Sequence, residues 1–258
     1  MIDVAIQAAK SAGDSIRTNF SASTLPTVTY KDPNNVVTQT DIAAENAIFS
    51  VLKKEFPDHA FFSEEAGLTQ TQSEYLWVID PLDGTSNFAH HLPFFCVSIA
   101  LFKQKQPVLG VIYDPIHDEL FSAETNQGAH LNSKPITSNT ANNLQTSVFL
   151  MARSGSAEAK QNHTKTYNLI TANVRTARVL GSGALSIAYV ACGRFDGVII
   201  NDCNFYDCAA ANIIAREAGA TVSDFQGNAL IHETEGTNNI LVTNKQLHPQ
   251  ITKLLIKL

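Results

Sequence analysis

The run from Trp77 to Phe88 constrains this chain more than any other segment, because it ends an apolar stretch in two closely spaced carboxylates. The stretch Leu76–Ile79 is typical of a buried strand, and it delivers Asp80 at its end. Pro81 follows and has no N–H to donate, so we expect the strand ladder to stop there. Asp83 comes three residues after Asp80. Two carboxylates on one turn repel each other unless a cation lies between them, and oxygen-only ligands suit Mg²⁺.

The same run continues into a segment that suits a phosphate group. Gly84, Thr85 and Ser86 follow directly, at a place where a helix or a backbone nest would begin. Backbone N–H groups at such a place favour an anion. A metal site and a phosphate site in one loop indicate phosphoryl chemistry.

The first half of the chain predicts two helices followed by a mostly antiparallel sheet. Apolar residues at helical spacing predict a helix over 2–20, and a second helix starts near Thr40 and Asp41 and stops at Pro57. Residues 21–37 are rich in Ser, Thr, Pro and Asn, which predicts a loop with at most a short strand. Apolar runs predict strands at 61–63, 95–102, 108–113 and 119–123.

The second half alternates strands with helices, which indicates an α/β layer arrangement. The predicted strands cover 148–152, 176–179, 197–200, 221–224 and 240–243. The predicted helices cover 160–172, 185–192, 207–219 and 249–257, and Gly219 is the expected C-cap residue of the third. A polar segment at 133–146 lies between the halves. We therefore expect a subdomain of residues 1–135 with the metal loop and a subdomain of residues 136–258 that completes the active site.

Composition narrows the classes of function. The 258 residues are enough to bury a core, and a net charge of −6 without a basic block gives no support for a nucleic-acid partner. The four cysteines form no C-x-x-C pair, which predicts a reduced, cytoplasmic protein. We find no signal-peptide pattern and no apolar stretch long enough to span a bilayer, so no membrane role is expected.

Each acidic candidate also has a purely structural interpretation. Asp80 and Asp83 are common turn residues, and Glu64-Glu65 after an apolar run is typical of a solvated surface pair. Asp41 and Asp207 stand near predicted helix starts, where an aspartate often serves as the N-cap. The eight histidines show no metal-ligand spacing.

Two longer motifs resemble the signatures of one enzyme family. The pattern W-x-I-D-P-(L/I)-D-G-T-x-N-F stands without departure from Trp77 to Phe88. The pattern W-D-x-A-A-G-x-x-I-x-x-E-A-G is matched from Tyr206 to Gly219, with Tyr206 in place of Trp and Ala211 in place of Gly. By these motifs the chain resembles, over nearly its whole length, the inositol monophosphatase family of Mg²⁺-dependent, lithium-sensitive sugar phosphatases.

The resemblance implies a fold, an assembly and a set of site residues. The fold is a layered α/β/α/β/α sugar-phosphatase sandwich, the assembly a homodimer, and the cofactor two or three Mg²⁺ ions per active site. The implied metal ligands are Glu64, Asp80, the Leu82 carbonyl, Asp83 and Asp207. Thr85, with Asp41 behind it, would orient the attacking water and share its proton. The implied substrate contacts are at Asp83, Gly84, Thr85, Ser86, Gly181, Ser182 and Asp207.

One departure from the family pattern bears on the substrate. Members that act on inositol commonly carry a sugar-binding glutamate seven residues before the second-motif aspartate, and here Ile200 stands there. Asn201 or Asp202 could supply the missing acceptor if the strand end is shifted by a residue. No metal ligand is missing, so we expect a phosphomonoesterase that acts on inositol monophosphate or related small sugar and polyol phosphates.

Alternatives remain open at this point. Fructose 1,6-bisphosphate, histidinol phosphate and a nucleotide 3′-phosphate are other substrates of the same chemistry. The nucleotide enzymes usually show D-G-T-K-E-F, whereas this chain has D-G-T-S-N-F over 83–88, which disfavours them. An alternative of another class is a regulatory binding protein that keeps the fold.

Overall fold

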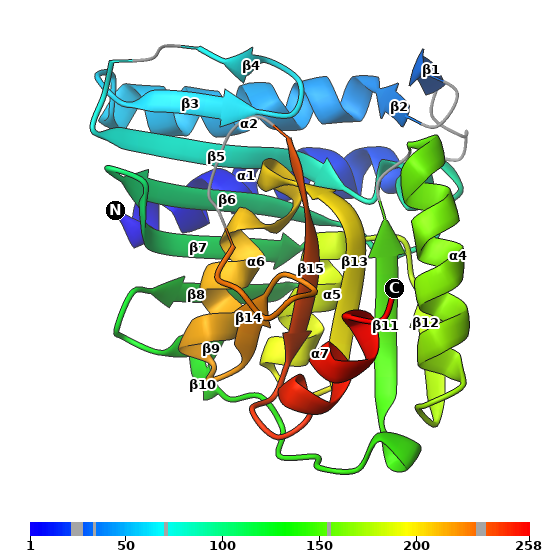
Figure 1. Cartoon of the computed structure of the whole chain (residues 1–258). Coiled ribbons are helices and arrows are strands. Elements are labelled where there is room, and N and C mark those ends of the chain that lie inside the picture. The colour runs from blue at the N-terminus through cyan, green and yellow to red at the C-terminus, as the bar shows by residue number, and fades with distance from the viewer. Residues whose placement is uncertain (22–27, 33–34, 70–71, 154–155, 231–235) are drawn as a thin grey trace.

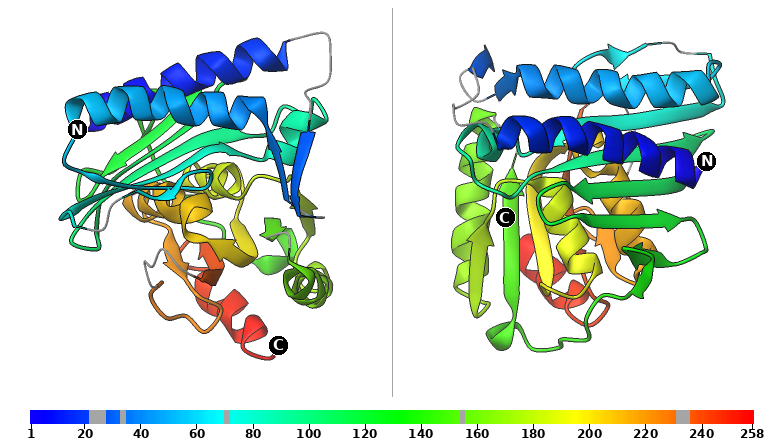
Figure 2. Two further views of the ribbon diagram at one scale, coloured as in Figure 1. Left: turned by 90° about the horizontal axis from the view of Figure 1, so that it is seen from above. Right: turned by 180° about the vertical axis from the view of Figure 1, so that it is seen from behind.

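The computed structural model describes residues 1–21, 28–32, 35–69, 72–153, 156–230 and 236–258. Over these residues, helices and two large sheets stack in alternating layers, as Figures 1 and 2 show in three views. The order is a helix pair, an eight-stranded sheet, a helix pair, a five-stranded sheet and a helix pair. This arrangement confirms the α/β/α/β/α sandwich.

The helix pairs enclose both sheets. They are α1 (Ile2–Phe20) with α2 (Gln39–Glu55), α5 (Gly183–Ala191) with α6 (Phe205–Glu217), and α4 (Ala157–Thr171) with α7 (His248–Leu255). Helices α1 and α2 cover one face of the eight-stranded sheet, and α5 and α6 lie between the two sheets. Two short helical segments complete the helical structure, α3 (Thr85–Ala89) and the 3₁₀ turn η1 (Leu144–Thr146).

The central strands of the eight-stranded sheet are buried on both faces. Its strands in spatial order are β10 (Lys134–Ile136), β9 (Ala129–Leu131), β8 (Glu119–Glu124), β7 (Gln106–Asp114), β6 (Cys96–Lys103), β5 (Tyr75–Asp83), β3 (Ala60–Ser63) and β4 (Gly67–Leu68). Only β3 and β5 pair in parallel among the described strands of this sheet. Trp77 and Ile79 of β5 belong to the core under α1 and α2, while Val78 between them belongs to the core around α5 and α6.

The five-stranded sheet is mixed. Its strands in spatial order are β12 (Thr176–Val179), β11 (Val148–Arg153), β13 (Gly197–Asn204), β15 (Thr237–Thr243) and β14 (Thr221–Ser223). Strands β12, β11 and β13 are parallel, so their carboxyl ends lie at one edge of the sheet. Strand β13 continues to Asn204, four residues beyond the predicted end, and α6 follows at once.

The structure differs from the prediction for residues 21–37 and leaves the predicted subdomain division untested. The segment 21–37 is more regular than expected, because β1 (Val28–Asp32) and β2 (Asn35–Thr38) form an antiparallel hairpin. Residues 22–27 and 33–34 of that segment lie outside the described residues. The expected division at residue 135 falls within β10, and the largest core cluster joins residues of both sheets. That division stays a prediction.

Helix α6 packs very closely on the eight-stranded sheet. Gly110 of β7 lies against the backbone of Ala210, and a Cβ at Gly110 would collide with the Ala210 carbonyl oxygen. Ala209 and Ala211 are also buried. A helix with such small side chains can approach the sheet backbone, and this close approach fixes the position of α6 relative to β7.

In the described part of the chain, no helix combines the length and apolar character needed to cross a bilayer. All four cysteines are free.

Candidate active site

Strand β5 carries both aspartates of the Trp77–Phe88 run, and an irregularity in its pairing turns them to one face. Asp80 is the register partner of Ser98 on β6, and Asp83 is the partner of Cys96. Three steps along β5 therefore match two steps along β6, as in a β-bulge with one extra residue. In a regular strand, residues three apart point to opposite faces. The bulge instead places both carboxylates on the face toward α5 and α6.

The expectation that Pro81 ends the strand is wrong. Strand β5 runs to Asp83, and Pro81 lies inside the irregular step between Asp80 and Asp83. A proline is tolerated at a bulge because the ladder is already interrupted there. The backbone N–H of Leu82 donates to Asp80 Oδ1 at 2.9 Å, which holds that carboxylate against the bulge.

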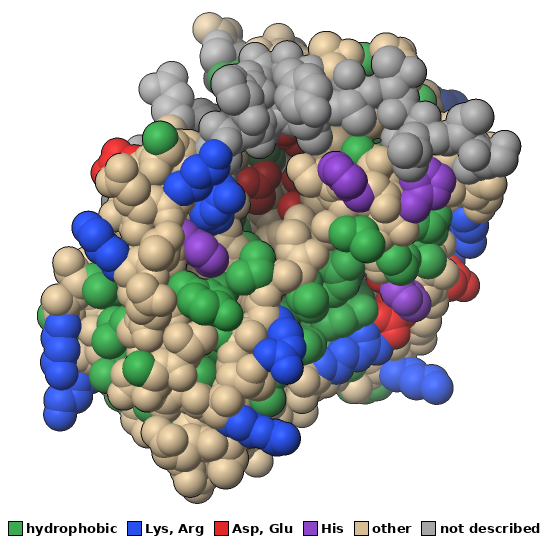
Figure 3. Space-filling view, turned by 90° about the vertical axis from the view of Figure 1, so that its right-hand side faces the viewer, with side chains coloured by type: hydrophobic (Ala, Val, Ile, Leu, Met, Phe, Trp, Pro, Cys, Tyr) green, Lys and Arg blue, Asp and Glu red, His purple; other side chains and the backbone are tan. Residues whose placement is uncertain are grey.

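Four acidic side chains act on one another around this strand. Burial raises the pKa of Asp80 well above its ordinary value, and the charges of Glu64, Asp83 and Asp207 raise it further. The pKa of Asp207 is also raised well above its ordinary value, first by burial and then by Asp83 and Glu64. These mutual effects show that the four predicted acidic ligands come from β3, β5 and α6 to one region. Figure 3 shows acidic side chains in a hollow on one face of the molecule.

Glu64 reaches this region from the end of β3. Its backbone N–H donates to the Ile79 carbonyl at 3.2 Å, beside Asp80 on the parallel strand β5. The neighbouring Glu45 of α2, itself buried, accepts hydrogen bonds from Ser63 Oγ and from the Ala66 N–H, the latter at 3.1 Å. Glu45 thus anchors both sides of the Glu64-Glu65 turn, and sequence analysis had no signal for this role.

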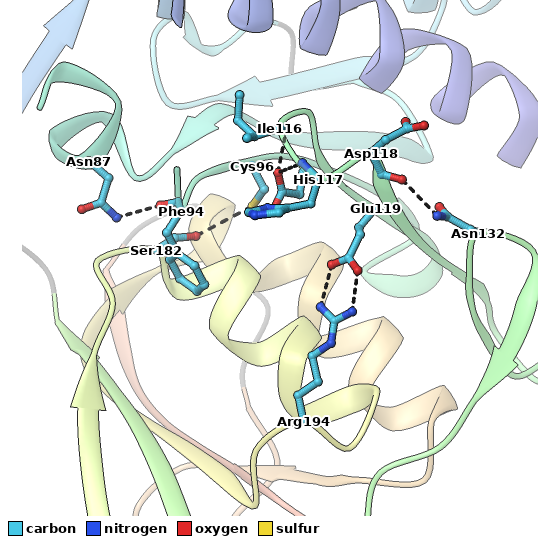
Figure 4. Close-up of polar contacts among 11 residues, drawn as sticks. Asn87, Phe94, Cys96, Ile116, His117, Asp118, Glu119, Asn132, Ser182 and Arg194 are labelled. Carbon is cyan, nitrogen blue, oxygen red and sulfur yellow. Dashed lines mark hydrogen bonds and ion pairs between the residues drawn. The ribbon is translucent and has the colours of Figure 1, made fainter. Parts of the chain in front are cut away.

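Asp83 is directed at the N-terminus of α5. It accepts hydrogen bonds from Ser182 Oγ, from the Ala184 N–H at 2.8 Å and from the Gly183 N–H at 3.3 Å. Burial raises the pKa of Asp83, and the Ser182, Ala184 and Gly183 hydrogen bonds offset part of that rise. The thiol of Cys96 lies 3.9 Å from Asp83 Oδ2 and 3.9 Å from Ser182 Oγ. Figure 4 shows Cys96 beside Ser182. Asp83 therefore connects the end of β5 to the loop before α5.

Thr85 and Asp41 form the predicted pair. Thr85 Oγ1 lies 2.9 Å from Asp41 Oδ1 and 3.0 Å from the Leu82 carbonyl oxygen. The second carboxylate oxygen of Asp41 accepts from the Thr38 N–H at 2.8 Å and from Thr38 Oγ1 at 2.6 Å. Asp41 is fully buried, and burial raises its pKa while the hydrogen bonds from Thr38 and Thr85 counteract the rise.

The N-cap interpretations of the two helix-start aspartates are wrong. Thr38 is the N-cap of α2 and forms a capping box with Asp41, which stands at the third helical position. The spacing T-x-x-D was a usable signal for that box. In α6 the N-cap is Asn204, and its side chain donates to Asp207 Oδ2 at 3.0 Å. Asp207 is therefore a first-turn residue whose carboxylate faces Asp83 and Glu64.

Asn87 holds the segment after β5 and the loop before α5 together, a role that sequence analysis missed. Its Nδ2 group donates to the carbonyls of Phe94 and Leu180, both at 2.7 Å, and Figure 4 shows the bond to Phe94. Gly181 lies beside Asn87 at a φ of 89°, and a Cβ there would come within 2.8 Å of Asn87 Nδ2. The fixed Asn in the D-G-T-x-N-F pattern was the one available signal.

The remaining predicted substrate residues lie around this junction. Gly84 adopts a left-handed conformation with φ 99° and is the N-cap of α3. Thr85 and Ser86 follow in the first turn, so their N–H groups have no partner within the helix. Ser182 is the N-cap of α5, and its hydroxyl accepts from the Leu185 N–H and donates to Asp83.

Ile200 and Asp202 lie on β13, where the family pattern has its sugar-binding glutamate. Ile200 is buried, and its Cδ1 would lie 3.5 Å from a Cβ at Gly183. Strand β13 does shift register after Ile200, and Asp202 has a positive φ of 61°. Its carboxylate accepts from Ser156 Oγ at 2.9 Å and from Thr237 Oγ1, so both of its oxygens are engaged away from Ile200.

The donors suit a divalent metal in their chemistry but are not arranged around one. Among the described residues, no three His, Cys, Asp or Glu side chains are placed to hold one ion as they stand. Buried carboxylates that raise one another's pKa are stabilised by a hard divalent cation. Ser98, the partner of Asp80 in the register, adds a fully buried hydroxyl with no hydrogen-bond partner in the described structure. The chemistry of these donors therefore suits a hard divalent cation.

The layered sandwich and the carboxylates between its sheets define a class of phosphomonoesterases. The model of the inositol monophosphatase family matches residues 1–258, and the chain belongs to this family. It is 37% identical over 260 residues to the Nus factor SuhB of Escherichia coli K12, covering 99% of this chain and 94% of that protein. It is 40% identical over 237 residues to inositol monophosphatase 3 of Solanum lycopersicum, covering 88% and 87%. The crystal structure of the extragenic suppressor protein suhB of Bartonella henselae superposes with a TM-score of 0.92 at 35% identity, covering 99% and 98%.

Proposed function

We propose that this protein is a Mg²⁺-dependent phosphomonoesterase that hydrolyses inositol monophosphate or related small sugar and polyol phosphates. The bulge in β5 carries the proposal, because it turns Asp80 and Asp83 to the face where Glu64 and Asp207 act on them. Family membership across the chain supports the reaction class.

The metal ligands we propose are the carboxylates of Glu64, Asp80, Asp83 and Asp207 and the Leu82 carbonyl. When bound there, Mg²⁺ supplies an acidified water and neutralises charge on the phosphoryl group. We propose two or three ions per site, since four carboxylates converging on one region repel one another strongly.

Thr85 and Asp41 would handle the proton of the attacking water. Thr85 Oγ1 has one proton and lies 2.9 Å from Asp41 Oδ1, so donation to Asp41 leaves the oxygen lone pairs of Thr85 for water. Burial raises the pKa of Asp41, which makes that carboxylate a better proton acceptor. The N–H groups of Gly84, Thr85 and Ser86 would hold phosphate oxygens, and the products are free phosphate and an alcohol.

Phosphate release from a panel of phosphomonoesters, with Mg²⁺ or with a chelator, tests the proposal. We expect release that depends on Mg²⁺, and inhibition by lithium that is uncompetitive or mixed with respect to substrate. Absence of release from every ester at saturating Mg²⁺ would contradict the proposal.

A second candidate of another class is a regulatory binding protein. It is favoured by the 37% identity to a protein named Nus factor SuhB, which matches this chain over 99% of its length. Under this candidate, charge-removing variants of the carboxylates would leave partner binding unchanged while they abolish phosphate release. We further propose a homodimer in the cytoplasm, the former from the family resemblance and the latter from the free cysteines.

A further inference from the structure

Ser98 on β6 carries a buried hydroxyl that has no hydrogen-bond partner in the described part of the chain. The residue is fully buried. Buried hydroxyls are normally paired, because an unpaired one loses its hydrogen bonds to water without replacing them. The position of Ser98 in the sheet identifies the acceptor that lies nearest to this hydroxyl.

The strand pairing places Ser98 beside Asp80 on the face that carries the acidic residues. Ser98 is the register partner of Asp80. Residues directly opposite each other in an antiparallel pair point to the same face, with Cβ atoms about 4.5–5.5 Å apart. The alternation along β6 agrees, because Ile99 belongs to the core under α1 and α2, while Ala100 belongs to the core around α5 and α6. Ser98, two residues before Ala100, therefore faces α5 and α6, as Asp80 does.

The strand on the other side of Ser98 gives its hydroxyl no acceptor. The register partner of Ser98 on β7 is Ile112, which is apolar. Farther along β7, Asp114 is engaged elsewhere: its Oδ1 accepts from the His117 N–H at 3.1 Å, and its Oδ2 lies 2.8 Å from His117 Nδ1. Of the two register partners of Ser98, Asp80 alone carries side-chain oxygens.

One hydrogen bond from the protein already holds the Asp80 carboxylate. The Leu82 N–H on β5 donates to Asp80 Oδ1 at 2.9 Å. Carboxylates that bind metals are commonly hydrogen-bonded by neighbouring groups, which orient them toward the ion. A donor on β6 would hold the carboxylate from a second strand and so fix its plane. Rotation about the Cα–Cβ bond of Ser98 moves its oxygen between staggered positions without any movement of the strand.

We propose that Ser98 is a positioning residue for Asp80, whose carboxylate accepts a hydrogen bond from the Ser98 hydroxyl when a divalent cation is bound. The inference rests on the proposed Mg²⁺-dependent function and adds a residue to its metal site. It gives Ser98 opposite effects in two states. Without a cation, the unpaired hydroxyl destabilises the fold. With a cation, the paired hydroxyl strengthens metal binding.

Direct measurement of metal binding tests this inference without reference to turnover. In a calorimetric titration of Mg²⁺ into metal-free protein, Ser98→Ala should raise the Kd about ten- to a hundredfold, the usual effect of removing a group that orients a metal ligand. Thermal melts give a second measurement. In a chelator, Ser98→Ala should melt at or above the wild-type temperature, because it removes an unpaired buried hydroxyl. At one fixed Mg²⁺ concentration it should melt below wild type, because weaker binding stabilises the fold less.

Ser147→Ala is the matched control. Ser147 is also buried, but its hydroxyl is paired, because it donates to the Asn143 carbonyl at 2.8 Å next to η1. This variant should lower the melting temperature equally with and without Mg²⁺ and leave the Kd for Mg²⁺ unchanged.

Two results for Ser98→Ala would overturn the inference while the proposed function stands. One is wild-type affinity for Mg²⁺, and the other is the same loss of stability in the chelator and in Mg²⁺, as expected for a purely structural serine. If the wild-type protein binds no Mg²⁺ in the titration, both proposals are overturned.

Discussion

The two sheets contribute to the site in different ways. The eight-stranded sheet contributes Asp80 and Asp83 from within a strand that is paired on both sides. The five-stranded sheet contributes from the ends of its strands: Ile200 lies near the end of β13, and Asp207 stands on the helix that follows β13. Residues inside a paired strand are fixed by register, whereas residues at strand ends can change with little effect on the sheet. We infer that the chemistry draws on the first sheet and on Asp207, whereas recognition of the leaving group depends on strand ends of the second sheet.

The largest test of this division is Asp80→Asn. The loss should reach several powers of ten for every substrate alike, because metal-activated water and charge stabilisation supply most of the barrier reduction. Steady-state kinetics on two or more esters would measure it. Asp58→Asn, at an exposed aspartate before β3, is the control. Near-normal turnover by folded Asp80→Asn protein would remove Asp80 from the metal site.

Asp207→Asn tests whether the second half of the chain also takes part in the chemistry. Because Asp207 is not the N-cap of α6, we expect a sharply raised Mg²⁺ requirement or loss of activity with little change in melting temperature. Activity should be titrated against Mg²⁺ beside a thermal melt. Asp3→Asn, which removes the exposed first-turn aspartate of α1, should alter neither. Normal activity of Asp207→Asn at low Mg²⁺ would leave this aspartate only a structural role.

Thr85→Val should lower kcat by about 10²–10⁴-fold, the usual contribution of a positioned proton-transfer group. Thr85→Ser keeps the hydroxyl 2.9 Å from Asp41 and should retain most of the activity. A single-turnover measurement separates this loss from slower product release. Full activity in Thr85→Val together with a loss in Thr85→Ser would show that the methyl group, and not the hydroxyl, matters.

A smaller effect is expected for substrate choice. Ile200 cannot accept hydrogen bonds from a polyol, and loss of a charged acceptor weakens recognition by about ten- to a hundredfold. We expect inositol 1-phosphate to be accepted alongside glycerol 2-phosphate and fructose 1,6-bisphosphate. Their kcat/KM values decide the matter. A preference for inositol 1-phosphate above about a thousandfold would break the division between chemistry and leaving-group recognition.

The smallest effect concerns the capping box of α2. Thr38→Ala removes hydrogen bonds to Asp41 and to the Thr40 N–H, and it should cost about 1 kcal/mol of stability. For a protein of this size the melting temperature should fall by about 2–4 °C. Thr38→Ser keeps the oxygen and should melt close to wild type. An unchanged melting temperature in Thr38→Ala would mean that the capping box contributes no measurable stability.

The periodic segments and the site motif could be predicted from sequence, because their signals are local. The apolar spacing that predicts a helix over 2–20 matches α1, and the strand predicted at 176–179 matches β12. The acidic residues could be chosen because they stand at the ends of recognisable elements. Their close approach, seen in the raised pKa of Asp80, fits that choice, while their role as ligands stays a proposal.

Features that depend on pairing could not be predicted. The continuation of β5 past Pro81 depends on β6, whose register supplies a partner for Asp83. The hairpin of β1 and β2 lacks a long apolar run, so composition pointed to a loop. The engagement of Asp202 by Ser156 and Thr237 joins segments far apart in the chain, and the sequence has no signal for it.

The bulge in β5 has a consequence for how this segment tolerates change. Whether Asp80 and Asp83 share a face depends on the number of residues between them, which is a matter of parity and not of side-chain type. Leu82 would serve through its carbonyl, which every amino acid possesses. Pro81 and Leu82 are both buried, so only apolar replacements of similar size would keep this geometry. Deletion of either one would remove the bulge: Asp80 and Asp83, then two residues apart, would still share a face, but with one backbone carbonyl fewer between them. The bulge therefore adds a backbone carbonyl between two carboxylates that a regular strand would space two residues apart.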